Sequence, residues 1–157
     1  MERLMCIFKD EKYTQYLETI NENEKTRIFC RHGLQHFLDV ARISYILNLE
    51  EGLGYSKEVI YVASFLHDIG RGAPKNIVTD HEKDSWIIGE ELLKKYSFSR
   101  EEMSLVKQAV LGHRTEDKKG FADLIYRGDK LSRDCYKCEA ESECYWPEEK
   151  KNKKIKY

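Results

Sequence analysis

The chain has 157 residues, a length that fits one domain with a sizeable core. Lysine and arginine together number 27 and aspartate and glutamate 28, so the formal net charge of −1 excludes a strongly basic nucleic-acid binder. The two prolines and nine glycines leave few helix breakers, which favours long helices over strands.

The sequence carries no signal for a membrane or for secretion. Apolar runs such as 62–66 are far shorter than the about 20 residues that a transmembrane helix needs. The first six residues lack a charged segment followed by the apolar core of a secretory signal. We therefore expect a cytoplasmic protein with no membrane partner. The five cysteines, an odd number, are then expected to be thiols or metal ligands and not a disulfide framework.

The first predicted elements along the chain are helices. Asp10 is placed to cap a first helix with apolar residues on one face. A second helix, from about Leu34 to Leu49, is apolar nearly all round, which predicts a central and largely buried position. Ser56 opens a third helix, which we expect to end at Gly70.

Two capping boxes mark the next helix starts. In such a box a Ser or Thr and a Glu three residues later each satisfy a free backbone N–H group. One pairs Thr79 with Glu82, and the other pairs Ser99 with Glu102. A last helix covers roughly 121–133. No segment shows convincing strand alternation, so the predicted fold class is all-α.

Several histidines and aspartates lie on apolar helix faces. His36 shares its face with apolar residues of the second helix, and His67 and Asp68 close the third. His113 and Asp129 lie on the apolar faces of later helices. A buried carboxylate costs several kcal/mol unless it is paired or bound to a metal, and imidazole with carboxylate suits a divalent metal. Each histidine alone is better explained as a hydrogen-bonded core residue, so the prediction of a metal depends on the whole set.

Most of these residues lie in three segments, which read HFLDVA at 36–41, FLHDIG at 65–70 and GDKL at 128–131. In this order they resemble the HD-domain superfamily of metal-dependent phosphohydrolases, whose pattern is a first histidine, a His-Asp pair and a distant aspartate. The resemblance covers about residues 28 to 133. It implies an HD-domain-like bundle of about six to seven helices, which we place at 1–134. A cysteine-containing segment with a charged tail follows at 135–157.

The resemblance also implies the ligands of one divalent metal ion, which are His36, His67, Asp68 and Asp129. His32 is the rival for the first position, and His36 is preferred because its distance to the following Val-Ala pair matches the family. The identity of the ion stays open among iron, manganese, zinc, magnesium, cobalt and nickel.

Some members of the superfamily hold two metal ions and use two further histidines. His81 and His113 lie in the matching interval, and Asp68 would then bridge the two ions. His81 would lie near the start of its helix, where the helix dipole favours the neutral, ligating imidazole. The alternative is a single ion, with His81 only lining the mouth of the site.

The activity that the resemblance implies is hydrolysis of a phosphate ester or anhydride, with a nucleotide as the expected substrate, by a hydroxide bound to the metal. Asp68 and Arg71 are the expected catalytic residues. Arg71, Arg114 and Lys75 are expected to bind the substrate phosphate, although for Lys75 an ordinary surface position is favoured. The alternative function is a non-catalytic HD-fold module that senses a nucleotide or binds a partner protein.

Three cysteines follow the last predicted helix. Cys135, Cys138 and Cys144 form a C-x2-C-x5-C pattern. Zinc and iron–sulfur centres usually need four protein ligands, so Cys30, Cys6, a histidine or a substrate would have to complete the set. The simpler interpretation is three reduced thiols in a short ordered tail. The resemblance to the HD-domain superfamily does not explain this segment.

Overall fold

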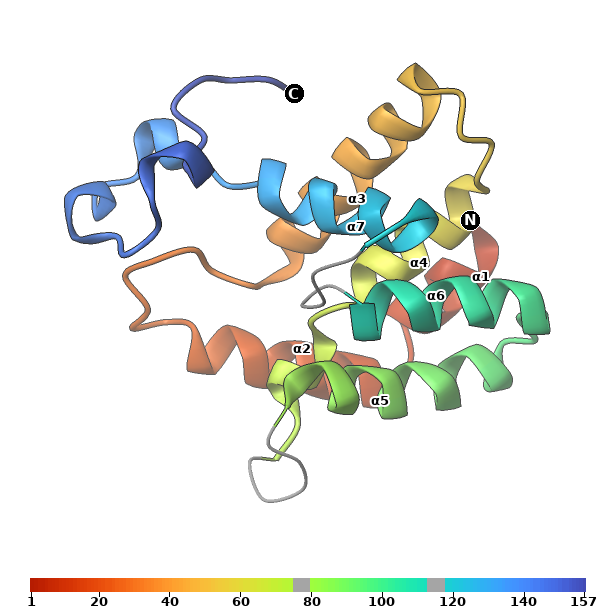
Figure 1. The fold of residues 1–157 in the computed structure, drawn as a ribbon. Helices are drawn as coiled ribbons and strands as arrows, with labels where there is room; N and C mark the ends of the chain where they lie inside the picture. The colour runs from red at the N-terminus through yellow and green to blue at the C-terminus, as the bar shows by residue number, and fades with distance from the viewer. Residues whose placement is uncertain (75–79, 113–117) are drawn as a thin grey trace.

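Most helices of the chain contact one central helix, α4 (Lys57–Leu66), and the C-terminal segment lies on one side of the bundle (Figure 1). The computed structural model describes residues 1–74, 80–112 and 118–157. Within these ranges it contains seven α-helices, four short 3-10 helices and no strand, which confirms the all-α fold. The α-helices are α1 (Glu2–Phe8), α2 (Glu11–Asn23), α3 (Leu34–Glu50), α4 (Lys57–Leu66), α5 (His81–Lys95), α6 (Arg100–Gly112) and α7 (Gly120–Leu131).

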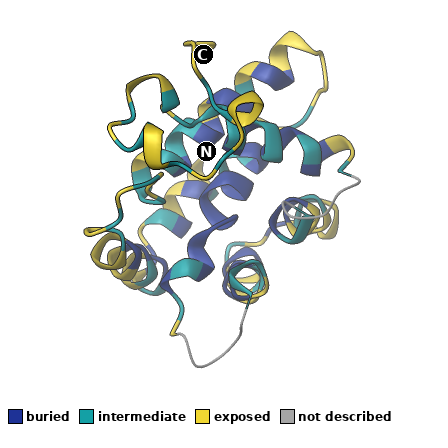
Figure 2. Cartoon of the chain, turned by 60° about the vertical axis from the view of Figure 1, so that its left-hand side comes forward, coloured by how far each residue is buried: buried dark blue, intermediate teal, exposed yellow. Residues whose placement is uncertain are grey.

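The central helix is α4, because it packs against α3 on one side and α6 on the other. Its apolar residues are buried with few exceptions, and the buried parts of the chain lie together in the middle of the molecule (Figure 2). The sequence predicts a central and largely buried position for α3, which packs against both α4 and α7 but is only partly buried. Ile46 and Leu49 on the outer face of α3 are exposed, so this helix has more apolar residues than the core buries.

The N-terminal region contains one helix more than the sequence predicted. Asp10 caps α2 as expected, since its carboxylate accepts a hydrogen bond of 3.0 Å from the backbone N–H of Lys12. The additional helix α1 precedes it and buries Leu4 and Ile7. Seven residues are too few to show a helical period, because they span less than two full turns.

The end of α4 differs from the prediction in a way that shapes the site. The α-helix stops at Leu66, and a 3-10 helix, η1 (Ile69–Gly72), follows the His-Asp pair. Gly70 touches the start of α5 so closely that a Cβ atom there would lie 2.2 Å from the carbonyl oxygen of His81. Its N–H also donates a hydrogen bond of 2.8 Å to Ser85 Oγ. This contact of η1 with α5 brings His81 next to Asp68.

The later helix ends follow the sequence closely, with shifts of one or two residues. Ser99 and Glu102 form the expected capping box, with reciprocal bonds of 3.2 and 2.8 Å. The N-cap of α5 is Asp80 and not the expected Thr79, which lies outside the described residues. The last helix, α7, ends at Leu131.

The contact between α3 and α7 is unusually close at one point. A Cβ atom on Gly128 would lie 2.1 Å from Ser44 Oγ and 3.0 Å from the carbonyl oxygen of Val40. Glycine therefore lets the two helix backbones approach each other. The next residue of α7 is Asp129, so this approach sets its carboxylate against the first turn of α3.

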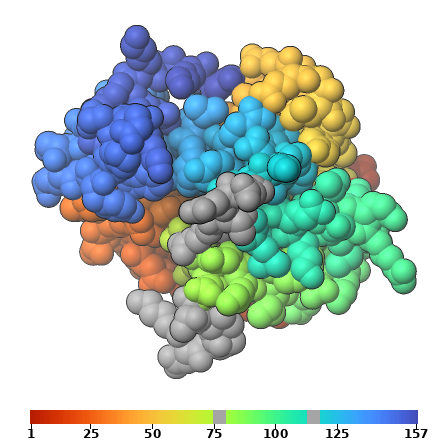
Figure 3. All heavy atoms as spheres, in the orientation of Figure 1, coloured from red at the N-terminus to blue at the C-terminus, as the bar shows by residue number. Residues whose placement is uncertain are grey.

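The C-terminal segment folds back onto the end of α7. Asn152 Nδ2 donates hydrogen bonds of 2.8 and 3.0 Å to the carbonyl oxygens of Lys130 and Arg133. Its three 3-10 helices are η2 (Cys135–Lys137), η3 (Glu141–Glu143) and η4 (Glu148–Lys150). In the space-filling view this blue segment lies against the orange residues that precede α3 (Figure 3). In the described part of the chain, no helix has the length and apolar character needed to cross a membrane.

Candidate metal centre

Three side chains from three helical regions form a compact group of metal-ligating atoms. His36 lies in the first turn of α3, His67 directly follows α4, and Asp129 lies on α7. Each offers one ligand atom, and these atoms all lie within 4.8 Å of one another. His36 Nε2 is 3.5 Å from Asp129 Oδ1. His67 and Asp129 are buried, so the group is largely withdrawn from solvent.

Hydrogen bonds on the far side of each imidazole fix which nitrogen carries the proton. His67 Nδ1 lies 2.7 Å from the carbonyl oxygen of Ser64, which can only accept, so Nδ1 is the donor. Ser132 Oγ donates to the carbonyl oxygen of Asp129 at 2.8 Å, which leaves the hydroxyl to accept from His36 Nδ1 at 3.2 Å. An imidazole that donates from Nδ1 can bind a metal through Nε2 when the ring is neutral, which is the arrangement typical of ligating histidines.

The charges of this group also suit a metal. Burial lowers the pKa of His36 to about 4, so its imidazole is neutral at neutral pH. Burial opposes ionisation of Asp129, yet Lys130, His67 and His36 lower its pKa to about 2. Metal binding requires neutral imidazole and ionised carboxylate. Among the described residues, His36 Nε2 is buried with no hydrogen-bond partner, and a bound ion would remove this deficit.

Asp68 lies at the centre of a wider group, and its two oxygens face different neighbours. Oδ2 lies 2.8 Å from Arg71 Nε and 3.6 Å from His67 Nε2. Oδ1 lies 3.0 Å from His81 Nε2. Burial opposes the charge of Asp68, but His67, His81, Arg71 and His32 together hold its pKa well below the usual value. An ionised carboxylate with two differently directed oxygens is able to contact two ions.

His32 lies in the loop before α3 and not on the helix, but it reaches the same site. Its ring makes an edge contact with His36 at a centroid distance of 5.3 Å, and Nε2 lies 3.8 Å from Asp68 Oδ2. Glu24 Oε2 lies 3.3 Å from His32 Nδ1 and accepts from its backbone N–H at 3.2 Å. Burial lowers the pKa of His32 to about 3. The structure therefore keeps His32 as a second candidate for the ligand position given to His36.

A large cavity of about 1440 Å³ opens from this group to the surface. Arg71 lines it with His32, His36, Asp68 and Asp129. The other predicted site residues, His113, Arg114 and Lys75, lie outside the described residues.

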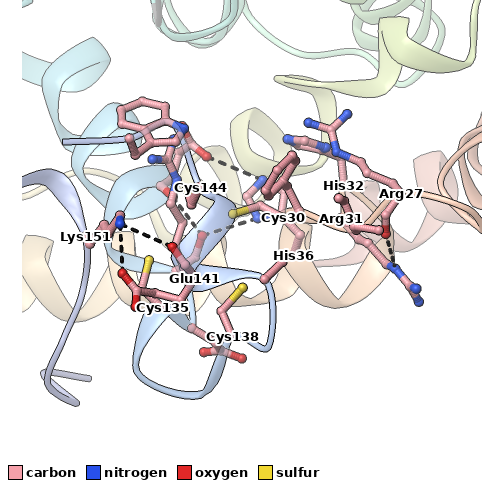
Figure 4. A pocket seen from close by; sticks show the side chains of 18 of the residues that line it. Arg27, Cys30, Arg31, His32, His36, Cys135, Cys138, Glu141, Cys144 and Lys151 are labelled. Atoms are coloured by element: carbon pink, nitrogen blue, oxygen red, sulfur yellow. Dashed lines mark hydrogen bonds and ion pairs between the residues drawn. The ribbon is translucent and has the colours of Figure 1, made fainter. Parts of the chain in front are cut away.

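The far side of the cavity is lined by Cys135, Cys138 and Cys144, together with Cys30 (Figure 4). Cys6 lies on α1, is exposed, and is absent from the described lining of this cavity.

Two residues of the site carried no signal in the sequence. Ser132 lies 96 positions from His36 in the sequence, and Glu24 belongs to the turn after α2. Neither residue is part of a motif or a periodic face. The only available indication was the general expectation that a ligating histidine has a hydrogen-bond partner on its other nitrogen.

Comparison with known proteins agrees with this geometry. The chain matches the model of the HD domain over residues 33–149. A protein of Clostridium beijerinckii, described as uncharacterized, is 49% identical over 157 residues, with both chains covered completely. No solved structure matches the chain. The match extends over most of the sequence and includes His36, His67, Asp68, His81 and Asp129, and the chain therefore belongs to the HD domain family.

Proposed function

We propose that the protein is a metal-dependent phosphohydrolase that cleaves a phosphate ester or anhydride, with a nucleotide as substrate. The observation that carries the proposal is the group of His36, His67 and Asp129, whose ligand atoms lie within 4.8 Å of one another. His36 and His67 each have a hydrogen-bond partner on Nδ1, namely Ser132 Oγ and the Ser64 carbonyl oxygen, and Nε2 is the atom that would bind the metal. Membership of the HD domain family supports the same reaction class.

The residues of the site fit a divalent ion. His36, His67, Asp68 and Asp129 supply two imidazoles and two carboxylates, a set suited to iron, manganese, zinc, magnesium, cobalt or nickel. A bound ion would lower the pKa of a water molecule and neutralise phosphate oxygens. The protein's own part is to hold the four ligands in fixed directions and to exclude bulk water from the buried side of the cavity.

A second ion would use the other side of Asp68. Its Oδ1 atom lies 3.0 Å from His81 Nε2, away from the oxygen that faces His67. His81 is the first residue of α5, so the contact of η1 with α5 fixes its position beside Asp68. We include His81 and His113 in the proposal as ligands of this second ion.

Arg71 is the proposed phosphate-binding and catalytic cation. Its Nε lies 2.8 Å from Asp68 Oδ2, and its side chain is a quarter exposed and lines the cavity. The guanidinium group is therefore placed between the ligand group and the open space. A planar guanidinium can bind two phosphate oxygens at once and stabilise the charge that develops on them. Arg114 and Lys75 are further candidates for the same task.

The test is phosphate release from a panel of nucleotides, dinucleoside polyphosphates and simple phosphate esters. We would run it without oxygen and with added Mn²⁺, Fe²⁺, Co²⁺ or Mg²⁺. Asp129→Asn is the test variant and Asp123→Asn is its matched control, because both lie on α7 and Asp123 pairs with Arg127 at the surface. We expect Asp129→Asn to lose at least about 100-fold in activity and Asp123→Asn to retain it.

Two outcomes separate the proposal from the alternative of a nucleotide sensor. Metal-dependent turnover that disappears in Asp129→Asn supports the phosphohydrolase. Nucleotide binding without turnover across the whole panel, with metal bound at the site, contradicts it and favours the sensor.

A further inference from the structure

Four of the five cysteines surround the outer part of the same cavity, and the proposed hydrolysis does not use them. Cys135, Cys138 and Cys144 come from the segment after α7, and Cys30 comes from the loop between α2 and α3. All four line the cavity, whereas Cys6 on α1 is absent from its described lining. Figure 4 shows side chains from both segments in this one region.

The C-terminal cysteines lie on two successive tight turns. Cys135 begins η2, and the N–H of Cys138 donates to its carbonyl oxygen at 3.3 Å. Cys144 closes η3 in the same way, with its N–H 3.2 Å from the carbonyl oxygen of Glu141. Such turns bring two cysteines of a C-x2-C pair to one side of the chain, which is the usual arrangement of thiolate ligands.

Cys30 lies beside these residues even though more than 100 positions separate them in the sequence. Cys30 lines the same cavity as Cys135 and Cys138, and Arg133 lines it as well. The neighbours of Cys30 and Cys144 also touch, because the rings of Phe29 and Tyr145 make an edge contact at 6.2 Å.

The segment that holds three of the cysteines has no hydrophobic core to keep it folded. No residue of 135–157 is buried, and the side chain of Tyr145 is 78% exposed. Its order depends on polar contacts such as Lys151 Nζ, which lies 2.8 Å from Glu141 Oε1 and 2.6 Å from Glu148 Oε1. Short segments without a core are commonly stabilised by a metal or by disulfides, and all five cysteines are free thiols in this structure.

We propose that Cys30, Cys135, Cys138 and Cys144 are the four ligands of a thiolate-bound metal centre, either an iron–sulfur cluster or a zinc ion. Four thiolates form a complete ligand set for either centre. Their protons would pass to solvent on binding, and Arg133 compensates part of the negative charge.

The centre would clamp the loop before α3 to the segment after α7. That loop also carries His32, two residues beyond Cys30, and Arg133 lies four residues beyond Asp129. The clamp would therefore form one wall of the cavity that the His/Asp site opens into. This proposal does not depend on the hydrolytic activity.

The test is a metal and sulfide analysis of full-length protein purified without oxygen. The measurement uses a His67→Ala background, so that metal at the His/Asp site does not contribute. We expect one centre per chain, seen either as iron with acid-labile sulfide and a brown colour, or as zinc. Cys30→Ser and Cys138→Ser should each lose it, and Cys6→Ser should retain it as the matched control.

Two further measurements cover the case that a cysteine variant does not fold. In the unmodified protein, a thiol reagent should react rapidly with one cysteine before chelation and with all five after it, since the sequence contains five. After chelation, added Co²⁺ should produce thiolate-to-cobalt charge-transfer absorption, which a His/Asp site does not give.

The proposal is overturned by any of three results. The first is protein with neither iron nor zinc in the His67→Ala background. The second is an unchanged metal content in Cys30→Ser and Cys138→Ser. The third is a freshly isolated protein in which the four cysteines form disulfides.

Discussion

Replacement of Ser132 by alanine tests the geometry of the metal centre at a residue that would not touch the metal. The hydroxyl links His36 Nδ1, at 3.2 Å, to the carbonyl oxygen of Asp129, at 2.8 Å. Without it, the imidazole of His36 loses the bond that fixes its tautomer and direction. Loss of such an outer hydrogen bond typically reduces metal affinity or activity by about 10- to 100-fold.

The assay is a calorimetric titration of metal-free protein with Mn²⁺, combined with phosphate release at saturating metal. We expect Ser132→Ala to bind the ion about 10-fold or more weakly. Helix α7 should persist in Ser132→Ala. Residue 132 caps this helix through its backbone N–H, which donates to the carbonyl oxygen of Gly128 at 3.0 Å, and alanine keeps this N–H.

Ser64→Ala is the matched control. The hydroxyl of Ser64 bonds the carbonyl oxygen of Ile60, whereas His67 uses the carbonyl oxygen of Ser64, which alanine keeps. The affinity for Mn²⁺ should therefore stay close to that of the unmodified protein. Ser132→Thr restores a hydroxyl and should recover much of the affinity. The reasoning is refuted if Ser132→Ala binds Mn²⁺ as tightly as Ser64→Ala does.

Three other consequences can be measured as stability. Gly70→Ala would place a Cβ atom 2.2 Å from a backbone carbonyl oxygen and should lower the free energy of unfolding in urea by about 3 kcal/mol. In the control Gly89→Ala the new Cβ meets a flexible leucine side chain at 3.3 Å, so the free energy of unfolding should change by less than about 1 kcal/mol. Equal effects of the two substitutions would contradict the close contact of η1 with α5. Burial opposes ionisation of Asp10, but the hydrogen bonds it accepts from the end of α5 and from its own helix lower its pKa below 3.8. The stabilisation of the fold by ionised Asp10 is therefore complete above pH 3.8 and is lost as the pH falls through the lower pKa of the folded protein. Acid unfolding of Asp10→Asn should lack this pH-dependent loss of stability, and an acid transition equal to that of the unmodified protein would contradict the prediction. Mn²⁺ at 100 times its dissociation constant should add about 2.7 kcal/mol to the unfolding free energy, and an equal gain in Asp129→Asn would show that the ion binds elsewhere.

Much of the ligand group could be predicted because its members lie in short local patterns. His67 and Asp68 end an apolar run, and Asp129 follows the apolar face of α7, so a carboxylate or imidazole at these positions had to enter the interior. The periodicity could not show where α4 stops, because Ile69 and Gly70 continue the apolar pattern while the close approach of α5 forces a 3-10 turn there.

The contacts that orient the ligands could not be predicted in the same way. Ser132 and His36 are distant in the sequence, and Glu24 reaches His32 only because the loop before α3 folds back. The meeting of Cys30 with the C-terminal cysteines is likewise a property of the tertiary fold. The sequence could name Cys30 only as one of several candidates for a fourth ligand.

The most direct test of the metal-dependent phosphohydrolase is a comparison of activity with metal occupancy in one titration. Phosphate release from the best nucleotide of the panel is measured as Mn²⁺ is added to metal-free protein, alongside the calorimetric binding curve. The account predicts that activity is absent without the ion, rises with the occupancy of the His36, His67 and Asp129 site, and stays near background in Asp129→Asn. Full activity in metal-free protein, or an Asp129→Asn curve that matches the unmodified protein, would contradict it.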